Sequence, residues 1–533
     1  MDTKILQILY GSDEKVVDVT EIIKQKLKDN LTFTIPSGDH ERAELFGDPI
    51  PFTLKRIYIK KDNFTESYSK NVSLTFNKNF EITVDKTIKS AVVSIAKFEK
   101  DYIVDFVKYH LLLGFTKIFI YDNEDTPVYQ ELFKENKDVT VIHFPGNSYY
   151  KAVQYAALEH FISNYINQFT HVAHIDIDEY IVLKQHRFIH DFIKEYIVDD
   201  CAGIAMNWRH FGSNGNSKNG LPDIFRFTKC EHSGNTHIKT IFDVSAYAGW
   251  STCHCVATQP GKYIKTTRGD IVIDNHNEKI DFNVIQLNHY KSKTFREFEF
   301  IRTRGRADLL IQPEEDVLES FNKYNLNEIE DYTAAIFYSG SLTNFLNVYN
   351  SEQLEGYCEQ VPQQLTDLKM LLEKLKPRNI LEIGFNGGHS SNFFLENSQA
   401  NIVSFDLNEH SYVKYGKIYI DTLYENRHTL ITGDSTKTIP EYHHSKFDLI
   451  FIDGGHTYNV SKLDLENCKR LADPNTIVIM DDTCFNNSWL APWNVGPNKA
   501  WLEAKSKNFI KENFTADYSI GRGMSWGLYN FKL

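Results

Sequence analysis

The sequence predicts a multidomain α/β protein, in which a small strand-rich module precedes two larger α/β domains. The chain has 533 residues, which is too long for a single hydrophobic core. Two long stretches alternate apolar strands with amphipathic helices, as chains that form parallel α/β sheets do. We therefore expect an accessory module at 1–88, α/β domains at 89–320 and 352–533, and a helical linker at 321–351.

Composition and charge narrow the class of protein. The net charge is −13, which disfavours binding to nucleic-acid phosphates. No window approaches 18 uninterrupted apolar residues, and the N-terminus lacks the apolar core of a signal peptide, so no membrane span is expected. Seven scattered cysteines without a CxxC pair favour reduced thiols and a cytoplasmic location, or the host cytoplasm if the source is a virus.

The first 88 residues are predicted to form short strands around one helix. Alternating apolar residues indicate strands at 5–9, 54–59, 72–76 and 80–84. A helix is expected at 19–27, with Asp18 or Thr20 as its N-cap. This module is assigned no chemistry.

The second block contains the first candidate site. Strands are expected at 91–96, 117–121 and 171–175, and helices at 102–113 and 152–165. The third strand runs into Asp176 and Asp178, and residues two apart on a strand point the same way. Two carboxylates at the carboxyl end of a strand suit a divalent cation that binds a diphosphate, although such pairs also occur by chance on acidic surfaces.

The segment 92–125, VVSIAKFEKDYIVDFVKYHLLLGFTKIFIYDNED, resembles the opening of glycosyltransferases of the GT-A fold. The similar group is the one related to family 92, with a family 2-like arrangement. The resemblance continues through Met206-Asn207-Trp208, an acceptor-side loop at 211–213, and a helix at 295–306. By this resemblance the residues that contact the nucleotide-sugar donor are Glu99, Asp122, Asp176 and Lys239, the last just before a strand.

The same resemblance implies a metal ion and a glycan acceptor. Residues 288–293, NHYKSK, are similar to the family's element that follows the donor site. Mn²⁺ or Mg²⁺ would be held by Asp176, Asp178 and His289, since a neutral imidazole suits Mn²⁺, although His289 could instead pack or donate a hydrogen bond. The catalytic base is left open among Asp223, Glu231 and Asp243. A zinc cluster of Cys230, Cys253, His254 and Cys255 fits no familiar spacing.

The third block begins with a helix at 365–375 and a strand at 379–383 that leads into a glycine-rich turn. Residues 379–391 read NILEIGFNGGHSS, and such turns bring the backbone close to a ligand at a helix N-terminus. A dinucleotide would also fit this pattern. Further strands are expected at 402–406, 449–453 and 477–481, with two more at 518–520 and 524–531.

The turn with an acidic residue at its head resembles class I methyltransferases that use S-adenosylmethionine. That resemblance implies cofactor contacts for six residues: Glu382, Gly384, Gly387, Asp406, Asp434 and Asp453. The segments FIDGGHTY (451–458) and VIMDD (478–482) are similar to metal-dependent sugar O-methyltransferases. In that group Mg²⁺ is bound at the positions of Asp453, Asp481 and Asp482, and the base is at the position of His456.

Together these features predict a bifunctional enzyme that transfers a sugar to a glycan and O-methylates a sugar hydroxyl. Two alternatives remain open at this point. One domain could be an inactive glycan-binding or scaffolding module, or the methyltransferase could act on an unrelated protein or small molecule. The donor sugar, the acceptor, the stereochemical outcome, the methylated position and the oligomeric state are not fixed by the sequence.

Overall fold

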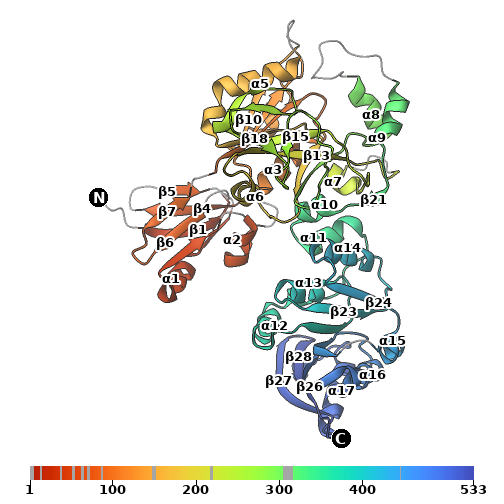
Figure 1. Ribbon diagram of the computed structural model, residues 1–533. Helices are drawn as coiled ribbons and strands as arrows, with labels where there is room; N and C mark the ends of the chain where they lie inside the picture. Colours follow the sequence, from red (N-terminus) through yellow and green to blue (C-terminus); the bar gives the residue numbers. More distant parts are fainter. Residues whose placement is uncertain are drawn as a thin grey trace. The chain divides into compact units, whose positions relative to one another are not determined.

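The computed structural model describes residues 5–12, 15–36, 39–50, 55–61, 65–68, 73–85, 88–146, 152–215, 220–303, 316–443 and 446–532. The chain divides into two compact units, Met1–Tyr338 and Ser339–Leu533, and each is described by itself (Figure 1). Within the described residues, no helix is both long and apolar enough to cross a membrane.

The N-terminal part of the first unit is strand-rich, as the alternating pattern predicts. Its four-stranded sheet has the order β2-β1-β4-β5, and a second sheet has the order β3-β6-β7. In β4, Ile57 and Ile59 point into a core that also takes Ile23 from α1. Asp18 accepts the N–H of Thr20 at 2.9 Å at the start of α1. The elements are β1 (Ile5–Gly11), β2 (Val16–Asp18), α1 (Thr20–Asp29), β3 (Thr32–Ile35), α2 (Asp39–Phe46), β4 (Arg56–Lys61), β5 (Thr65–Tyr68), β6 (Ser73–Asn77) and β7 (Ile82–Asp85).

The rest of the first unit is built on a ten-stranded sheet. Strands β10, β9, β8 and β11 are parallel, as expected, but β15 runs antiparallel to both β11 and β13, so the sheet is mixed. Its strands are β8 (Ser90–Ala96), β9 (Lys117–Asp122), β10 (Val139–His143), β11 (His171–His174), β12 (Glu179–Leu183), β13 (Cys201–His210), β15 (Ile238–Asp243), β18 (Tyr263–Lys265), β19 (Ile271–Val272) and β20 (Ile285–His289).

Helices cover both faces of this sheet. Val92 of β8 joins a core with residues of α3, whereas its neighbours Ala91 and Val93 join a core with residues of α5. Successive side chains of a buried strand point to opposite faces, which explains the continuous apolar run of β8. The helices are α3 (Ile103–Leu112), α4 (Gln130–Phe133), α5 (Val153–Asn164), α6 (Ile189–Tyr196), α7 (Asp223–Arg226) and α8 (Phe295–Arg302). Residues 304–306 of the expected helix at 295–306 lie outside the described residues.

The predicted linker is helical, but its first half packs into the first unit. The helices are α9 (Val317–Tyr324), α10 (Thr333–Ser339) and α11 (Leu342–Tyr349). The short strand β21 (Ile329–Glu330) pairs with β14 (Lys229–Cys230), and Ala334 and Tyr338 lie in the main core. Apolar side chains of α10 therefore hold this stretch in the domain.

The second unit contains a seven-stranded sheet in the order β24-β23-β22-β25-β26-β28-β27. Five strands are parallel and β28 and β27 are antiparallel, which is a Rossmann-like arrangement. The strands are β22 (Asn379–Ile383), β23 (Asn401–Asp406), β24 (His428–Thr432), β25 (Phe447–Ile452), β26 (Ala472–Asp481), β27 (Ile510–Ser519) and β28 (Arg522–Tyr529). The helices are α12 (Pro362–Leu375), α13 (His389–Glu396), α14 (Val413–Leu423), α15 (Ser435–Glu441), α16 (Tyr458–Cys468) and α17 (Val495–Ser506).

Candidate functional site

The glycine-rich turn of the second unit lies between β22 and α13, as predicted. Gly384 has a φ of +92° and Gly388 a φ of +84°, so both use the left-handed region that favours glycine. A Cβ added to Gly384 would lie 1.9 Å from the carbonyl oxygen of Asp453, whereas one on Gly387 would meet Leu346 and His389 at 3.0 Å. The turn therefore brings the ends of β22 and β25 together, and only glycine fits at residue 384.

Replacing Gly384 by alanine is expected to destabilise the second unit by about 4 kcal/mol, because the methyl group would collide with backbone. Gly340, with a φ of +72° and nothing within 4 Å of its added Cβ, is the matched control. Gly340→Ala is expected to cost only about 1 kcal/mol, the price of the left-handed backbone alone. Thermal unfolding of both variants measures the difference, and equal losses would contradict a steric role for Gly384.

Glu382 is enclosed by serine hydroxyls. Its carboxylate is fully buried and accepts hydrogen bonds from Ser390 and Ser391 of α13 and from Ser404 of β23, the last at 2.6 Å. Burial raises the pKa of Glu382 to about 7, although the three serine hydrogen bonds oppose that rise. This carboxylate joins α13 to the sheet beneath the turn, so its predicted contact with a cofactor would act through the turn.

Asp406 ends β23 beside the same turn. One of its oxygens accepts the N–H of Asn386 at 2.8 Å and the other accepts the N–H of Asn408 at 2.6 Å. The carboxylate is half-buried, so its remaining lone pairs can accept hydroxyl groups of a ligand. Asp434, also predicted to contact the cofactor, is the N-cap of α15 and accepts the N–H of Thr436 at 3.0 Å.

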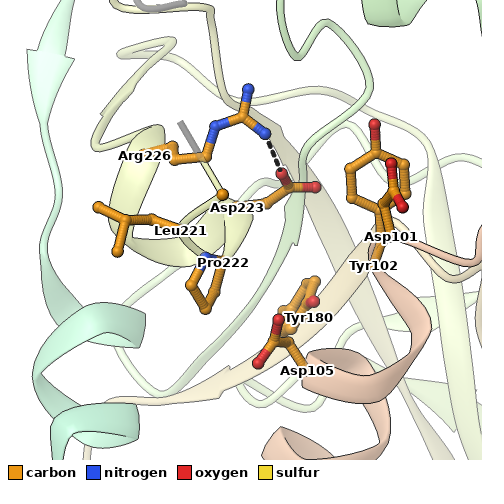
Figure 2. Close-up of a pocket in the computed structure, with 9 residues that line it drawn as sticks. Asp101, Tyr102, Asp105, Tyr180, Leu221, Pro222, Asp223 and Arg226 are labelled. Carbon is orange, nitrogen blue, oxygen red and sulfur yellow. Dashed lines mark hydrogen bonds and ion pairs between the residues drawn. The ribbon is translucent and has the colours of Figure 1, made fainter. Parts of the chain in front are cut away.

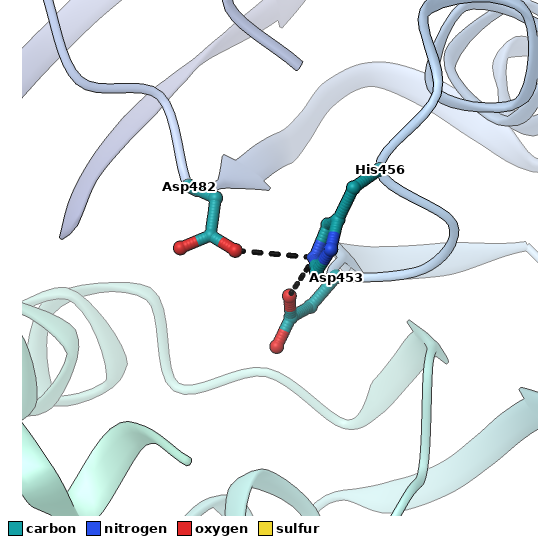
Figure 3. Close-up of side chains that lie close together, drawn as sticks. All are labelled: Asp453, His456 and Asp482. Carbon is teal, nitrogen blue, oxygen red and sulfur yellow. Dashed lines mark ion pairs between the residues drawn. The ribbon is translucent and has the colours of Figure 1, made fainter. Parts of the chain in front are cut away.

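A carboxylate–histidine group lies at the carboxyl ends of β25 and β26 (Figure 3). The Nε2 atom of His456 lies 3.1 Å from Asp482 Oδ2 and 4.0 Å from Asp453 Oδ1. Ligand atoms of these three residues all lie within 4.8 Å of one another, which is close enough to share one metal ion. Among the described residues, this is the sole group of three or more such side chains with that spacing.

This group differs in one residue from the predicted set of metal ligands, which contained Asp481 and not His456. Asp481 is the last residue of β26, and its buried carboxylate accepts a hydrogen bond from Gln364 of α12 at 2.6 Å. His456, predicted as the base, stands beside Asp453 and Asp482 instead. Asp482 adopts a φ of +54°, and this left-handed turn directs successive carboxylates to different partners. Asp481 as a ligand remains a prediction.

The two carboxylates control the protonation of His456. Asp453 and Asp482 raise the pKa of the imidazole to about 10, so it is protonated at neutral pH when both are charged and unneutralised. A protonated imidazole cannot accept a proton. A cation bound by the two carboxylates would remove the cause of the raised pKa, and the predicted role of His456 as a base depends on that neutralisation.

The aspartates of the first unit lie where β11 turns into β12. Asp176 follows β11, and Asp178 lies in the turn before Glu179 rather than on an extended strand. Asp176 accepts hydrogen bonds from Gln154 Nε2 and Lys239 Nζ, both at 3.0 Å. Burial opposes the charge on Asp176, but Lys239 and His174 together outweigh it, and the pKa is lowered to about 2.

The side chain of Asp178 lies beside His289. The distance from Asp178 Oδ2 to His289 Nε2 is 3.5 Å, and β20 delivers His289 beside Glu179 on β12. Burial lowers the pKa of His289, and the nearby Asp178 only partly offsets that effect, so the imidazole is neutral and able to bind a metal. Among the described residues, the three predicted ligands Asp176, Asp178 and His289 do not form a single close group, and Asp176 contacts Lys239 instead.

Lys239 lies within β15 rather than before it, and it is fully buried. Its ammonium is 3.0 Å from Asp176 Oδ2 and 3.7 Å from Glu179 Oε2. Burial raises the pKa of Glu179 well above its usual range in spite of Lys239. The lysine therefore compensates the charge of Asp176 beneath the candidate donor site.

The other predicted donor contacts are buried. Asp122 ends β9, and its carboxylate accepts backbone N–H groups of Glu124, Val128 and Tyr129 at 2.8 to 3.2 Å. Glu99 is 2% exposed, and its backbone N–H donates to the hydroxyl of Tyr129 at 3.0 Å. Both residues shape the loop after β9, and their contact with a nucleotide remains a prediction.

None of the three candidate bases has a free carboxylate at the site. Asp223 forms ion pairs with Arg226 and Lys293. Glu231 accepts the backbone N–H of His210 at 2.7 Å. Asp243 pairs with the first residue of β11, so it lies at the opposite end of that strand from Asp176.

Sequence reasoning missed His210. This residue ends β13, is the register partner of His289, and is 2% exposed. Neither of its ring nitrogens has a hydrogen-bond partner, and its ring centroid lies 5.0 Å from that of His289. The sequence does contain a pattern, because β13 and β20 both end in histidine. The two strands are 79 residues apart, however, so their pairing could be known only from the fold.

In comparisons with known proteins, one family model matches within each of the two compact units. The family model described as glycosyltransferase family 92 matches residues 89–335, and the one described as methyltransferase domain matches residues 381–483. The uncharacterized protein y4gI of Sinorhizobium fredii is 25% identical over 171 residues, which are 30% of this chain and 18% of that protein. The chain thus spans less than a fifth of this relative's length.

Solved structures similar to the chain include methyltransferases. The O-methyltransferase of Bacillus cereus in complex with SAH is 21% identical, and the match covers 44% of this chain and 100% of that chain with a TM-score of 0.30. The SAH-bound methyltransferase PaMTH1 of Podospora anserina is 18% identical, with 41% and 98% covered and a TM-score of 0.30. On the two family matches, the chain joins a glycosyltransferase family 92 domain to a methyltransferase domain.

Proposed function

We propose that the chain is a bifunctional glycan-modifying enzyme. Its first domain transfers a sugar from a nucleotide-sugar donor to a glycan acceptor with Mn²⁺ or Mg²⁺, and its second O-methylates a sugar hydroxyl with S-adenosylmethionine and Mg²⁺. The observation that carries the proposal is the Asp453–His456–Asp482 group beside the glycine-rich turn. The proposed location is the cytoplasm, or the host cytoplasm for a viral source.

The residues of the methyltransferase domain fit both S-adenosylmethionine and a divalent cation. Gly384 and Gly388 keep the turn open to a cofactor, and Asp406 presents free lone pairs beside it. Asp453 and Asp482 offer hard oxygen ligands that suit a divalent cation, and His456 lies beside both of them. S-adenosylmethionine supplies the methyl group when bound. With a cation bound by the two carboxylates, the imidazole of His456, 3.1 Å from Asp482, would be neutral and would take the proton of an acceptor hydroxyl.

The glycosyltransferase residues fit a diphosphate held through a cation. Asp178 and the neutral His289 supply one oxygen and one nitrogen ligand at 3.5 Å from each other. Asp176 keeps a partly exposed carboxylate at the same end of the sheet, and Lys239 limits the negative charge beneath it. Covalent linkage of the two domains raises the effective concentration of the second active site toward the product of the first.

Mass spectrometry of glycans incubated with a nucleotide sugar, S-adenosylmethionine and metal tests the proposal. The wild type is expected to add one sugar residue and one methyl group. Asp178→Ala should lower sugar transfer by at least about 100-fold, because it removes a cation ligand. Asp125→Ala, at a side chain 94% exposed in the same domain, is the control and should retain activity.

The order of the two reactions can be read in the same experiment. If methylation follows sugar transfer, Asp178→Ala abolishes both mass changes, whereas Asp406→Ala abolishes only the methyl group. Methylation that persists in Asp178→Ala would mean an acceptor unrelated to the first domain's product. Full sugar transfer by Asp178→Ala would refute the proposed donor site.

A further inference from the structure

Exposed apolar side chains lie at the carboxyl edge of the methyltransferase sheet. They come from the segment that leads from β26 into α17 and from the turn between β27 and β28. The backbone N–H of Gly521 in that turn donates to the carbonyl oxygen of Trp489 at 2.7 Å, so the two segments are joined. Large apolar residues on them are 42% to 65% exposed, namely Leu490, Trp493, Val495 and Ile520. Apolar residues exposed together in this way mark a candidate binding surface.

The indole of Trp493 is fixed in place although it is exposed. Its Nε1 donates a hydrogen bond to the carbonyl oxygen of Gly521 at 3.1 Å. A Cβ added to Gly521 would lie 2.5 Å from the indole, so the ring packs directly on the turn. Gly521 also has a φ of +73°, which favours glycine at this position. A ring that is held before a ligand arrives loses little conformational entropy on binding.

The two neighbours of Trp493 contact the carboxylate–histidine group described above. Arg522 begins β28 directly after the turn that holds the indole, and its Nη1 atom lies 3.4 Å from Asp482 Oδ1. On the other side, α17 begins two residues after Trp493, and a Cβ added to Gly496 would lie 2.1 Å from the carbonyl oxygen of His456. A ligand stacked on the indole would therefore lie beside the residues proposed to carry methyl transfer.

Three other aromatic rings that a sugar could use are buried or already stacked. Figure 2 shows Tyr102 and Tyr180 at a cavity of about 220 Å³ in the glycosyltransferase domain, but both side chains are buried. In the methyltransferase domain, Trp526 stacks on Phe514 with ring centroids 3.7 Å apart, so one face of its indole is covered. Compared with these rings, Trp493 offers the more accessible surface.

We infer that Trp493 is the platform of an acceptor subsite for methyl transfer, on which a pyranose ring stacks the C–H groups of one face. The negative face of an indole attracts such C–H groups, and burying them removes apolar area from water. Leu490 and Ile520 extend the apolar surface on the two joined segments. The inference rests on the proposed methyl transfer and names how its acceptor is recognised.

Fluorine NMR of the full chain labelled with fluorotryptophan tests the subsite, in the presence of S-adenosylhomocysteine and Mg²⁺. The chain has six tryptophans, and the resonance that is missing from Trp493→Phe identifies Trp493. Methyl β-glucoside and methyl β-galactoside should shift this resonance in a saturable way. Sorbitol carries similar hydroxyl groups but has no ring face, so it should not. No shift with either glycoside, or an equal shift with sorbitol, would overturn the inference.

A matched pair of leucine variants tests the apolar surface around the platform. Leu490→Asp should weaken binding of methyl β-glucoside at least about threefold, because it removes apolar contact area, whereas Leu502→Asp should leave binding unchanged. Both leucines are 49% exposed, and Leu502 lies about two turns into α17. Equal losses from the two variants would overturn a role for this surface. The readout is binding alone, so failure here is distinguishable from failure of the proposed function, which methylation of glycans by wild type and Asp406→Ala reports.

Discussion

Replacing Asp482 by asparagine is expected to lower the rate of methyl transfer by about 1,000-fold, while binding of S-adenosylmethionine changes little. The substitution removes the charge that faces His456 Nε2 at 3.1 Å and one of the two oxygen ligands for the proposed cation. Asparagine is among the residues that best tolerate the φ of +54° found here, so the backbone should be retained. Initial rates with excess cation measure the loss, and isothermal titration measures cofactor binding.

The control for this variant is Asp473→Asn. Asp473 lies near the start of β26, at the opposite end of the strand that precedes Asp482, and its side chain is exposed. Activity of the control should remain within about twofold of the wild type. A wild-type rate for Asp482→Asn would show that the Asp453–His456–Asp482 group has no part in methyl transfer, and restored activity at very high cation concentration would support its role as a ligand.

Most strands of the methyltransferase sheet could be predicted because they carry strong local signals, but β24 (His428–Thr432) was missed. β22 occupies residues 379–383 as expected, since a buried apolar run ends at a glycine turn. β27 is ten residues long, although only its last two lie in the predicted strand at 518–520. Its side chains alternate between buried or half-buried and exposed, and the charged residues Lys511 and Glu512 hide the strand pattern at this sheet edge.

The mixed sheet of the first unit was harder to predict. The strand–helix alternation from β8 to β11 gives the expected parallel pairs, but β15 is antiparallel to two strands. Direction depends on how the chain returns across the sheet, and local periodicity carries no record of that path.

Which acidic residues lie near strand ends could be predicted, but their partners could not. Asp453 and Asp482 meet as expected because β25 and β26 are adjacent parallel strands. In contrast, Lys239 donates a hydrogen bond to Asp176, 63 residues away in the sequence, and Gln364 donates one to Asp481, 117 residues away. Long side chains from neighbouring elements decide these pairings, so they depend on the tertiary fold.

Lys239 gives the second prediction, which concerns the stability of the glycosyltransferase domain. Lys239→Met keeps most of the side-chain volume but leaves Asp176 and Glu179 without their cation. Removing one member of a fully buried ion pair costs about 3–5 kcal/mol, but the Asp176 side chain is 35% exposed and water screens its charge, so the expected loss is about 2 kcal/mol. Thermal unfolding of the full chain should show the transition of the glycosyltransferase domain at a lower temperature while that of the methyltransferase domain is unchanged.

A matched control and a rescue separate charge from packing. Lys265→Met breaks the pair between Lys265 and the exposed Asp200, 2.7 Å apart in the same domain, and should change the unfolding temperature much less than Lys239→Met does. Adding Asp176→Asn to Lys239→Met should recover part of the lost stability, since it removes the charge that Lys239 faces at 3.0 Å. An equal loss from Lys265→Met and Lys239→Met would contradict the electrostatic explanation.

The pH dependence of Lys239→Met follows from the same pairing. Burial already raises the pKa of Glu179, and Lys239 is the main group that opposes burial at both carboxyl groups, so without it both folded-state pKa values should rise. Carboxyl groups with a raised folded pKa bind protons more tightly in the folded state, so stability falls as pH rises. The deficit of Lys239→Met relative to the wild type should therefore be smaller at pH about 5 than at pH about 8. A deficit that grows at acidic pH would place the cost in lost packing rather than in uncompensated charge.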